Sequence, residues 1–388
     1  MSSVVVIGGG IVGASVAWHL KVDRAWPGSV TVLERDPSYA QAATALSASG
    51  LRQQFTTALN IRLSQYGLAF LHARRTPEGA AIPFRENGYL ILAGDAAQAE
   101  GLRTAHTLQR DEGADVALLS PAQIAARYPG LSTGDLALGS LGLSGEGWFD
   151  GLALLRGLRA ESQAAGALWQ RAEAAAIECD PSGAAAGVTL TDGTRLAAAW
   201  VVNAAGTRAP ALARTAGLAL PVEPRKRTVF CFGCETPPPG QAGWPLIADP
   251  SGMWLRPEGA GFIAGKAPTA DPAVAPDDFE PRSNEFDEAL WPLLAARARC
   301  FEAVRMTGLW AGHYDWNTHD QNAILGPAPG VPGLLLATGF SGHGLQHGAG
   351  VGRGLAEWIA KGSYRSLDLT PLHACRLTAA PTAEANIY

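Results

Sequence analysis

The 388-residue chain has little of what marks several large protein classes. Its five cysteines (Cys179, Cys231, Cys234, Cys300 and Cys375) are too few and too scattered for a disulfide framework in a chain this long. Cys231 and Cys234 would face opposite sides of a strand, so we expect no metal site there. No stretch approaches the roughly 20 apolar residues of a membrane span. We therefore expect a protein of a reducing compartment, by default the cytoplasm.

Positive charge is also scarce. Lys and Arg number 30 against 35 Asp and Glu, and the formal net charge of −5 argues against a nucleic-acid partner. The one basic run, residues 225–227, leads into the strand-like residues 228–232, and we interpret it as a solvated strand start rather than a phosphate patch. The N-terminus lacks a basic leader and glycines interrupt its apolar run, so we do not expect a signal peptide.

Glycine and apolar residues, by contrast, are abundant. The chain has 46 glycines and 47% hydrophobic residues, which suits an α/β enzyme with many tight turns. Its length exceeds the size at which a single hydrophobic core usually stops growing. We therefore expect two lobes.

The N-terminal residues 4–13 read Val-Val-Val-Ile-Gly-Gly-Gly-Ile-Val-Gly. A short buried strand runs directly into Gly8, Gly10 and Gly13, which have the G-x-G-x-x-G spacing of a dinucleotide-binding turn. In such a turn the first glycine permits the tight bend, the second admits a pyrophosphate, and the third lets the next helix pack closely. That helix begins near Ile11 and Val12 and would point its free N–H groups at the phosphates. Taken alone, the glycines fit an ordinary strand–helix turn equally well.

A second strand, residues 30–33, ends at Glu34. An acidic residue about 20 positions after the last glycine is expected to bind a ribose 2′-hydroxyl. It would repel a 2′-phosphate, so the spacing favours FAD or NAD over NADP. The alternative is an ordinary surface glutamate at a strand end.

Further along, segments typical of a nucleotide-binding domain alternate with segments of another strand and helix pattern. The patterns predict a helix near 59–74, a strand at 88–93, a helix from Pro121, and a helix at 152–165 with Asp150 as its N-cap. Asp192-Gly193 predicts a hairpin turn, and residues 200–203 a strand. Strand-like runs at 228–232, 253–255, 262–264 and 307–314 indicate an antiparallel sheet, and 272–281 reads as a Pro/Asp-rich loop.

Residues 334–338 predict another buried strand, followed by the glycine loop 339–344 and a helix at 345–360. A second strand–glycine loop–helix so late in the chain implies one discontinuous nucleotide domain that the C-terminal part completes. The predicted fold class is α/β, with a Rossmann-like domain formed by 1–85, 141–215 and 326–365. A mixed or antiparallel substrate domain, 86–140 and 216–325, is inserted into it. Residues 366–388 read as a loosely structured tail.

The chain resembles the FAD-dependent D-amino-acid oxidase superfamily, nearest to its glycine oxidase, monomeric sarcosine oxidase and dimethylglycine dehydrogenase branch. The resemblance rests on four segments in order: 8–13 with Glu34-Arg35, 47–55, 201–206, and 339–346. The last, Gly-Phe-Ser-Gly-His-Gly-Leu-Gln, is the most specific. Residues 50–55 also look like the mitochondrial FAD-dependent oxidoreductase that assists respiratory-complex assembly, and its bacterial relatives.

The resemblance implies bound FAD and oxidation of a C–H bond next to nitrogen. Besides the residues of the first turn and Glu34, it assigns FAD contacts to Arg35, Ser47, Ala48, Ala205, Gly206, Gly339, Gly342, His343, Gly344, Leu345 and Gln346. Relatives that attach FAD covalently use a histidine in the 44–50 region or a cysteine near Gly312. This chain has neither, so we expect non-covalent FAD.

Candidate substrate residues follow from the same resemblance. Arg52 is expected to bind a substrate carboxylate, which a planar guanidinium matches bidentately, or the flavin region beside it. A surface ion pair is the alternative. His343 would add a hydrogen bond or positive charge beside reduced flavin, unless it only packs in its loop. His313, Tyr314 and Arg256 are candidates for the substrate wall, and Trp148 and Trp254 for an aromatic cage, although each could be merely structural.

Three functions remain open at this point. The first is oxidation of an amino acid or N-substituted amino acid, or a related amine, to an imine, with oxygen, a quinone or a carrier protein as acceptor. The second is oxidation of a 2-hydroxy acid, which would need His313 or His343 as a base. The third is a flavin-binding assembly or scaffold protein with little turnover, which residues 50–55 alone suggest.

Overall fold

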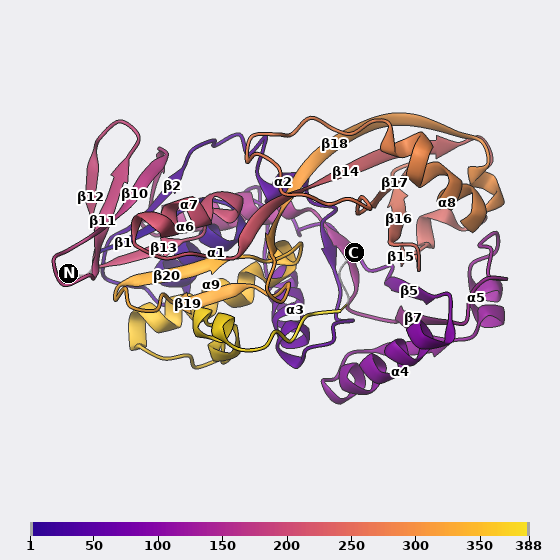
Figure 1. Ribbon diagram of the computed structural model, residues 1–388, viewed down its shortest axis with the longest axis horizontal. Coiled ribbons are helices and arrows are strands. Elements are labelled where there is room, and N and C mark those ends of the chain that lie inside the picture. The colour runs from indigo at the N-terminus through magenta and orange to yellow at the C-terminus, as the bar shows by residue number, and fades with distance from the viewer. Residues whose placement is uncertain (1–2, 386–388) are drawn as a thin grey trace.

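The computed structural model describes residues 3–385, and it places two large β-sheets toward opposite ends of an elongated molecule (Figure 1). A six-stranded sheet lies at the end that carries the N-terminus, and an eight-stranded sheet at the other. Across the described residues, no helix is both long and apolar enough to cross a membrane.

The six-stranded sheet gathers strands from distant parts of the chain. Its order is β19 (Ile324–Pro327), β20 (Leu334–Thr338), β13 (Trp200–Asn203), β1 (Val4–Ile7), β2 (Val30–Glu34) and β9 (Leu168–Arg171). All neighbours are parallel except β19 and β20. β1 and β20 are buried at every residue, as expected for strands covered on both faces.

Helices cover one face of this sheet and a small sheet the other (Figure 1). Val4 and Val6 of β1 join the core with α1 (Ile11–Trp18), α6 (Gly151–Ala164) and α9 (Gly344–Lys361). Val5 and Ile7 face the antiparallel strands β10 (Ala174–Cys179), β11 (Ala185–Leu190) and β12 (Arg195–Ala197). The N-terminal strand therefore alternates between two cores, because successive side chains point to opposite faces.

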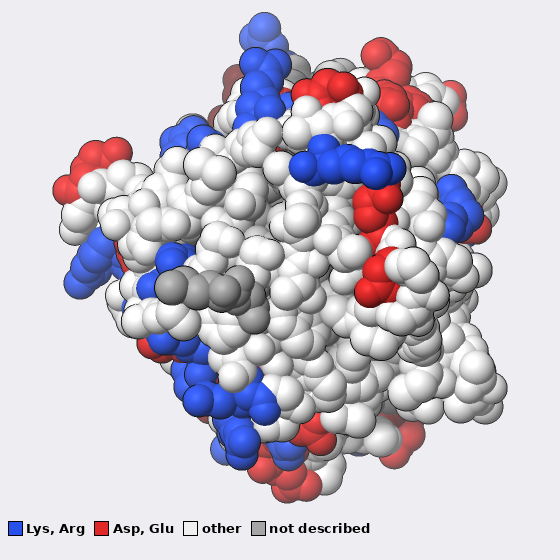
Figure 2. All heavy atoms as spheres, turned by 90° about the vertical axis from the view of Figure 1, so that its left-hand side faces the viewer, with Lys and Arg blue, Asp and Glu red and all other residues white. Residues whose placement is uncertain are grey.

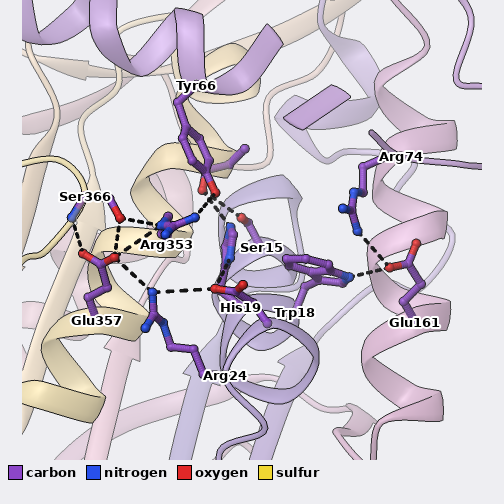
Figure 3. A network of polar contacts seen from close by, with 12 residues as sticks. Ser15, Trp18, His19, Arg24, Tyr66, Arg74, Glu161, Arg353, Glu357 and Ser366 are labelled. Carbon is purple, nitrogen blue, oxygen red and sulfur yellow. Dashed lines mark hydrogen bonds and ion pairs between the residues drawn. The ribbon is translucent and has the colours of Figure 1, made fainter. Parts of the chain in front are cut away.

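A polar network ties the helical layer together (Figure 3). Glu357 of α9 is fully buried and accepts hydrogen bonds from Arg24 Nη2 (3.0 Å), Arg353 Nε (3.2 Å) and Ser366 Oγ (2.6 Å). Arg353 Nη1 also donates to the hydroxyl of Tyr66 on α3 (Ala58–His72). None of these residues lines the cavity described below, so we assign the network to helix packing.

The eight-stranded sheet builds the second domain. Its order is β18 (Val304–Asn317), β14 (Val222–Cys234), β17 (Gly261–Lys266), β16 (Met253–Glu258), β15 (Leu246–Ala248), β5 (Tyr89–Ala93), β7 (Leu138–Gly142) and β6 (Val116–Leu119). Only β15 and β5 pair in parallel within it. An aromatic cluster of Phe230, Phe232, Trp244, Phe262 and Phe301 fills its core. The helices α4 (Ala96–Asp111), α5 (Pro121–Arg127) and α8 (Trp291–Arg297) belong to this domain.

Short elements join the two domains. β3 (Gly50–Leu51), β8 (Gly147–Phe149) and β4 (Phe84–Arg85) form a three-stranded sheet. The remaining helices are α2 (Ala43–Leu46) and α7 (Ala209–Thr215). Figure 2 views the end with β10–β12, where side chains of both signs surround a largely uncharged middle.

The predicted α/β class, with a discontinuous Rossmann-like domain and an inserted mixed sheet, is confirmed. The proposed domain limits at 140 and 325 cut through β7 and β19. The basic run at 225–227 is not a solvated strand start: Lys226 is buried and pairs with Asp278, and Arg227 pairs with Asp271. The tail is ordered in its described part, with 3₁₀ turns at Thr370–Leu372 and Ala374–Thr378; residues 386–388 lie outside that part.

Candidate functional site

A cavity of about 600 Å³ runs along the carboxyl ends of β1, β2 and β13 and on to the eight-stranded sheet. Open α/β sheets bind ligands at this edge, where connections leave the strands in opposite directions. Most of the predicted site residues line it: Gly8, Gly10, Ile11, Val12, Glu34, Arg35, Ser47, Ala48, Arg52, Ala205, Gly206, His313, Tyr314, Gly342, His343, Gly344, Leu345 and Gln346. Gly13, Arg256 and Gly339 are not among its lining residues.

The β1–α1 turn leaves no room for side chains. Gly8 has φ +97°, and a Cβ there would lie 2.4 Å from the carbonyl oxygen of Ala204. A Cβ at Gly13 would lie 1.9 Å from the carbonyl oxygen of Gly8, so this glycine lets α1 approach β1 without touching the cavity itself. One N–H at the helix start is already used, since Ile11 donates to Thr44 Oγ1 at 3.1 Å. The other N–H groups of the first turn lack helical partners and can bind phosphate.

Glu34 lies at the end of β2 on the same cavity. Its carboxylate accepts from the backbone N–H of Gly9 (2.9 Å) and of Asp36 (2.8 Å). Burial raises the pKa of Glu34 above its ordinary value, although these two N–H groups oppose the rise. The neighbouring Arg35 lies within 4 Å of Glu173 and Asp277. The acidic group is therefore held where a ribose hydroxyl could donate to it.

Arg256 supports the site from outside instead of forming the substrate wall. Its Nε and Nη2 donate to the carbonyl of Ala48 at 3.2 and 3.1 Å, and its Nη1 pairs with Glu258. Its guanidinium lies over the ring of Trp148, 4.9 Å from the centroid. Neither Arg256 nor Trp148 lines the cavity, whereas Trp254 does. Arg256 thus fixes the segment that holds Ser47 and Ala48.

The loop between β20 and α9 is shaped by polar contacts. Gly339 N donates to Asp315 Oδ2 (2.7 Å), and Ser341 N donates to the Asp315 carbonyl (3.1 Å). Ser341 has φ +52°, a left-handed conformation that costs energy for a residue other than glycine. Burial raises the pKa of Asp315 to about 6. The loop is held so that the N-terminus of α9, with its free N–H groups and positive dipole end, faces the cavity.

Arg52 and His343 meet at this end of the cavity. Arg52 Nη2 lies 3.3 Å from His343 Nε2, and Nη1 donates to the carbonyl of Gln54 at 2.7 Å. The guanidinium also lies 3.9 Å from the centroid of the Phe55 ring. Burial, the Arg52 charge and His347 hold the pKa of His343 well below its ordinary value. His343 is therefore neutral near pH 7, and the positive charge comes from Arg52.

The Arg52 segment has a buried carboxyl group beneath it. Glu146 Oε1 accepts from the backbone N–H of Gln53 at 2.6 Å, and Oε2 from Gln54 Nε2 at 2.8 Å. On the other side, the backbone N–H of Arg52 donates to Gln346 Oε1 at 2.8 Å. The segment is thereby fixed from two sides, by residues far apart in the sequence. No sequence pattern indicates Glu146, which the pairing of the adjoining β8 with β3 brings close from far along the chain.

His313 and Tyr314 are neighbours on β18 but serve opposite faces, because side chains alternate along a strand. Tyr314 packs against the glycine loop: a Cβ on Gly342 would lie 2.7 Å from its ring. The His313 ring stacks on Phe279 with centroids 4.1 Å apart, and its Nε2 lies 2.7 Å from the carbonyl oxygen of Asp278. Tyr314 thus accompanies Arg52 and His343, whereas His313 belongs with the Pro/Asp-rich loop.

Several lining residues were not predicted. The Pro/Asp-rich loop contributes Val274, Pro276 and Phe279. Its aspartates Asp277 and Asp278 pair with Arg208 and Lys226, and Asp271, just before the loop, pairs with Arg227. Tyr89 of β5, Arg227 of β14 and Lys266 of β17 also line the cavity. Their sequence signal is weak, since each lies within an ordinary strand pattern.

The cavity fits FAD. The glycine turn admits a phosphate, Glu34 is held for a ribose, and the α9 N-terminus with Arg52 offers positive charge to the anionic edge of a reduced flavin. Within residues 3–385, no group of three or more His, Cys, Asp or Glu side chains is arranged to hold a metal ion.

Comparisons with known proteins agree with this geometry. The family model described as FAD dependent oxidoreductase (DAO) matches residues 3–358. The FAD-dependent oxidoreductase domain-containing protein 1 of Bos taurus is 39% identical over 410 residues, which cover 95% of this chain and 83% of the bovine protein.

Two solved structures have the same fold. L-proline dehydrogenase from P. horikoshii superposes with a TM-score of 0.85 at 24% identity, covering 97% of this chain and 98% of that one. Glycine oxidase from Geobacillus kaustophilus gives a TM-score of 0.78 at 22% identity, covering 96% and 98%. The resemblance seen in the sequence is thus confirmed, and FAD is the cofactor. The chain belongs to the DAO family of FAD-dependent oxidoreductases.

Proposed function

We propose that this protein oxidises the C–N bond of an amino acid or N-substituted amino acid to an imine. The observation that carries the proposal is the Arg52 guanidinium beside neutral His343, at the end of the cavity where α9 begins. A guanidinium binds a carboxylate through two parallel hydrogen bonds. The solved proteins that share this fold include L-proline dehydrogenase and glycine oxidase, whose named substrates are amino acids.

In this proposal the residues bind and orient the substrate. Arg52 holds the carboxylate, while Tyr314, Tyr89 and Trp254 enclose the rest of the molecule. FAD supplies the hydride acceptor when bound. The N-terminus of α9 and the Arg52 charge stabilise negative charge that develops beside them.

An amine fits this site better than a 2-hydroxy acid. Oxidising a hydroxy acid requires a base for the hydroxyl proton, and an effective base has a pKa near the working pH. The pKa of His343 is well below that range, and His313 is stacked on Phe279. An amine that binds in its neutral form needs no such base.

We also propose an electron acceptor and a cellular compartment, each only as a class. Oxygen, a quinone or a carrier protein each fit the chemistry, and reoxidation in air separates the first from the others. Five free cysteines suit a reducing compartment, and we propose the cytoplasm.

The test is anaerobic mixing of the yellow protein with glycine, sarcosine, proline, D- and L-amino acids and 2-hydroxy acids, followed at the flavin absorbance. Bleaching by amino acids alone supports the proposal, and bleaching by hydroxy acids alone refutes it. A flavoprotein that no compound bleaches would favour an assembly or scaffold role.

Arg52→Lys tests the carboxylate contact. Lysine keeps the charge but loses the bidentate geometry, so KM should rise roughly tenfold or more with a smaller change in kcat. Arg62→Lys, at an exposed ion pair with Glu112, is the matched control and should behave as wild type. An unchanged KM in Arg52→Lys would remove Arg52 from the substrate site.

A further inference from the structure

The C-terminal tail reaches back to the Arg52 segment. Glu384 is 2% exposed, and its carboxylate accepts hydrogen bonds from Thr56 N (2.8 Å), Thr56 Oγ1 (2.6 Å), Thr57 Oγ1 (3.0 Å) and Asn60 Nδ2 (3.0 Å). The backbone N–H of Ala385 also donates to Thr56 Oγ1 at 3.1 Å. A buried carboxylate with four donors is a specific contact, because a buried charge without such partners is strongly unfavourable.

This contact lies at the start of α3, whose own N-cap residue, Thr57, makes no side-chain capping bond. Glu384 places a negative charge at that N-terminus, where the helix dipole favours it. The tail thus places a carboxylate at that N-terminus across more than three hundred residues of sequence, bonded to Thr56 N and to side chains of the turn.

From the first turn of α3 the contacts lead directly to the candidate substrate site. Thr56 follows Phe55, whose ring lies under the Arg52 guanidinium and meets His343 edge-on, with centroids 5.0 Å apart. Asn60, which also bonds the tail, has its backbone hydrogen-bonded to His347, one turn after His343. Moving Thr56 would therefore move the support of both Arg52 and His343.

A second branch reaches the glycine loop. Asn60 Nδ2 donates to Asn322 Oδ1 at 2.8 Å, and the Asn322 carbonyl accepts from Asn317 Nδ2 at 2.6 Å. The backbone N–H of Asn317 donates to Ser341 Oγ at 3.0 Å, and Ser341 is the residue with φ +52°. A strained residue persists only where its surroundings hold it. Through Asn60, Asn322 and Asn317, the tail is part of the surroundings that hold Ser341.

We propose that Glu384 is a positioning residue of the active site: its carboxylate fixes the residues 52–57 so that Arg52 and His343 are held for the substrate carboxylate. The expected effect on substrate binding rests on the role proposed for Arg52, whereas the expected effect on the order of residues 52–57 does not.

The test compares Glu384→Gln with wild type by hydrogen–deuterium exchange and by titration with acetate, an unreactive carboxylate, followed through the flavin absorbance. Glutamine keeps the size but loses the charge and half of the acceptor capacity. We expect exchange in peptides from 52–60 to rise on the order of tenfold, with residues 4–18 unchanged, because charge-assisted hydrogen bonds are lost. The Kd for acetate should rise by a similar factor, and the flavin content should stay constant.

Two further variants sharpen the test. Asp368→Asn removes an exposed tail carboxylate that bonds only nearby Thr370 in the tail, and it should leave both readouts unchanged. Thr56→Val removes the hydroxyl donor from the other side, and its effect combined with Glu384→Gln should be less than additive.

The proposal is overturned if exchange at 52–60 is unchanged in Glu384→Gln, or if exchange rises equally in all peptides, which would indicate general destabilisation. If acetate does not bind wild type at all, the carboxylate site under the proposed function fails, and the exchange pattern alone then decides the role of the tail.

Discussion

Glu146 should give the stability of this protein a distinctive pH dependence. Its carboxyl group is 1% exposed, lies beneath Gln53 and Gln54, and interacts electrostatically with Arg52. Burial raises its pKa from 4.5 to about 7, against the opposing effects of its hydrogen bonds and of Arg52. Between these two values the folded protein keeps a proton that the unfolded chain has released.

The sign and size of the change in the free energy of unfolding with pH follow from proton linkage. Because the folded state binds more protons than the unfolded state in this window, the free energy of unfolding falls as pH rises. The stabilisation is complete below pH 4.5 and is lost progressively up to pH 7. At about 1.4 kcal/mol for each pH unit, this carboxyl accounts for a loss of about 3 kcal/mol.

Glu146→Gln isolates this contribution, since an amide mimics the protonated acid and does not titrate. Urea unfolding at pH 4.5 should give similar free energies for wild type and variant, and at pH 7.5 the variant should be more stable by up to about 3 kcal/mol. The exposed Glu100→Gln, as control, should follow wild type at both pH values. A difference between variant and wild type that is the same at both pH values would refute the reasoning.

Three other predictions follow from the fold. Gly13→Ala places a Cβ 1.9 Å from the carbonyl oxygen of Gly8 and should abolish FAD retention, measured as the flavin-to-protein absorbance ratio; Gly101→Ala, where nothing lies within 4 Å, should retain it. Full retention in both would contradict our view of the turn. Arg297→Ala leaves Asp249 buried without its 2.6 Å partner and should cost about 3–5 kcal/mol in urea unfolding, so a loss below about 1 kcal/mol would count against a buried pair. Acid precipitation should release all flavin into the supernatant, and yellow pellets would show covalent attachment.

The sequence predicted best where the evidence is local. The strand, glycine turn and Glu34 follow one another within a few dozen residues, and the spacing alone fixes their relation. The alternation of His313 and Tyr314 along a strand does not tell what each side chain contacts, because the partners of each face are known only once the neighbouring elements are placed. Arg256, Glu146 and Glu384 act through partners more than ninety residues away, and no periodicity reports such contacts.

The helices that cover the six-stranded sheet come from distant parts of the chain, and this has a consequence for protein synthesis. α1 is buried along its whole length, and its partner α9 begins only at residue 344, so Ser15 and His19 meet the Ala349 carbonyl across more than three hundred residues. A nascent chain therefore carries an apolar helix without its partner until residues 344–361 leave the ribosome. Closing so long a loop is also slow, because its entropy is lost before the contacts form. We expect FAD to enter only after α9 has been synthesised, and truncated chains that lack α9 to aggregate rather than to bind FAD.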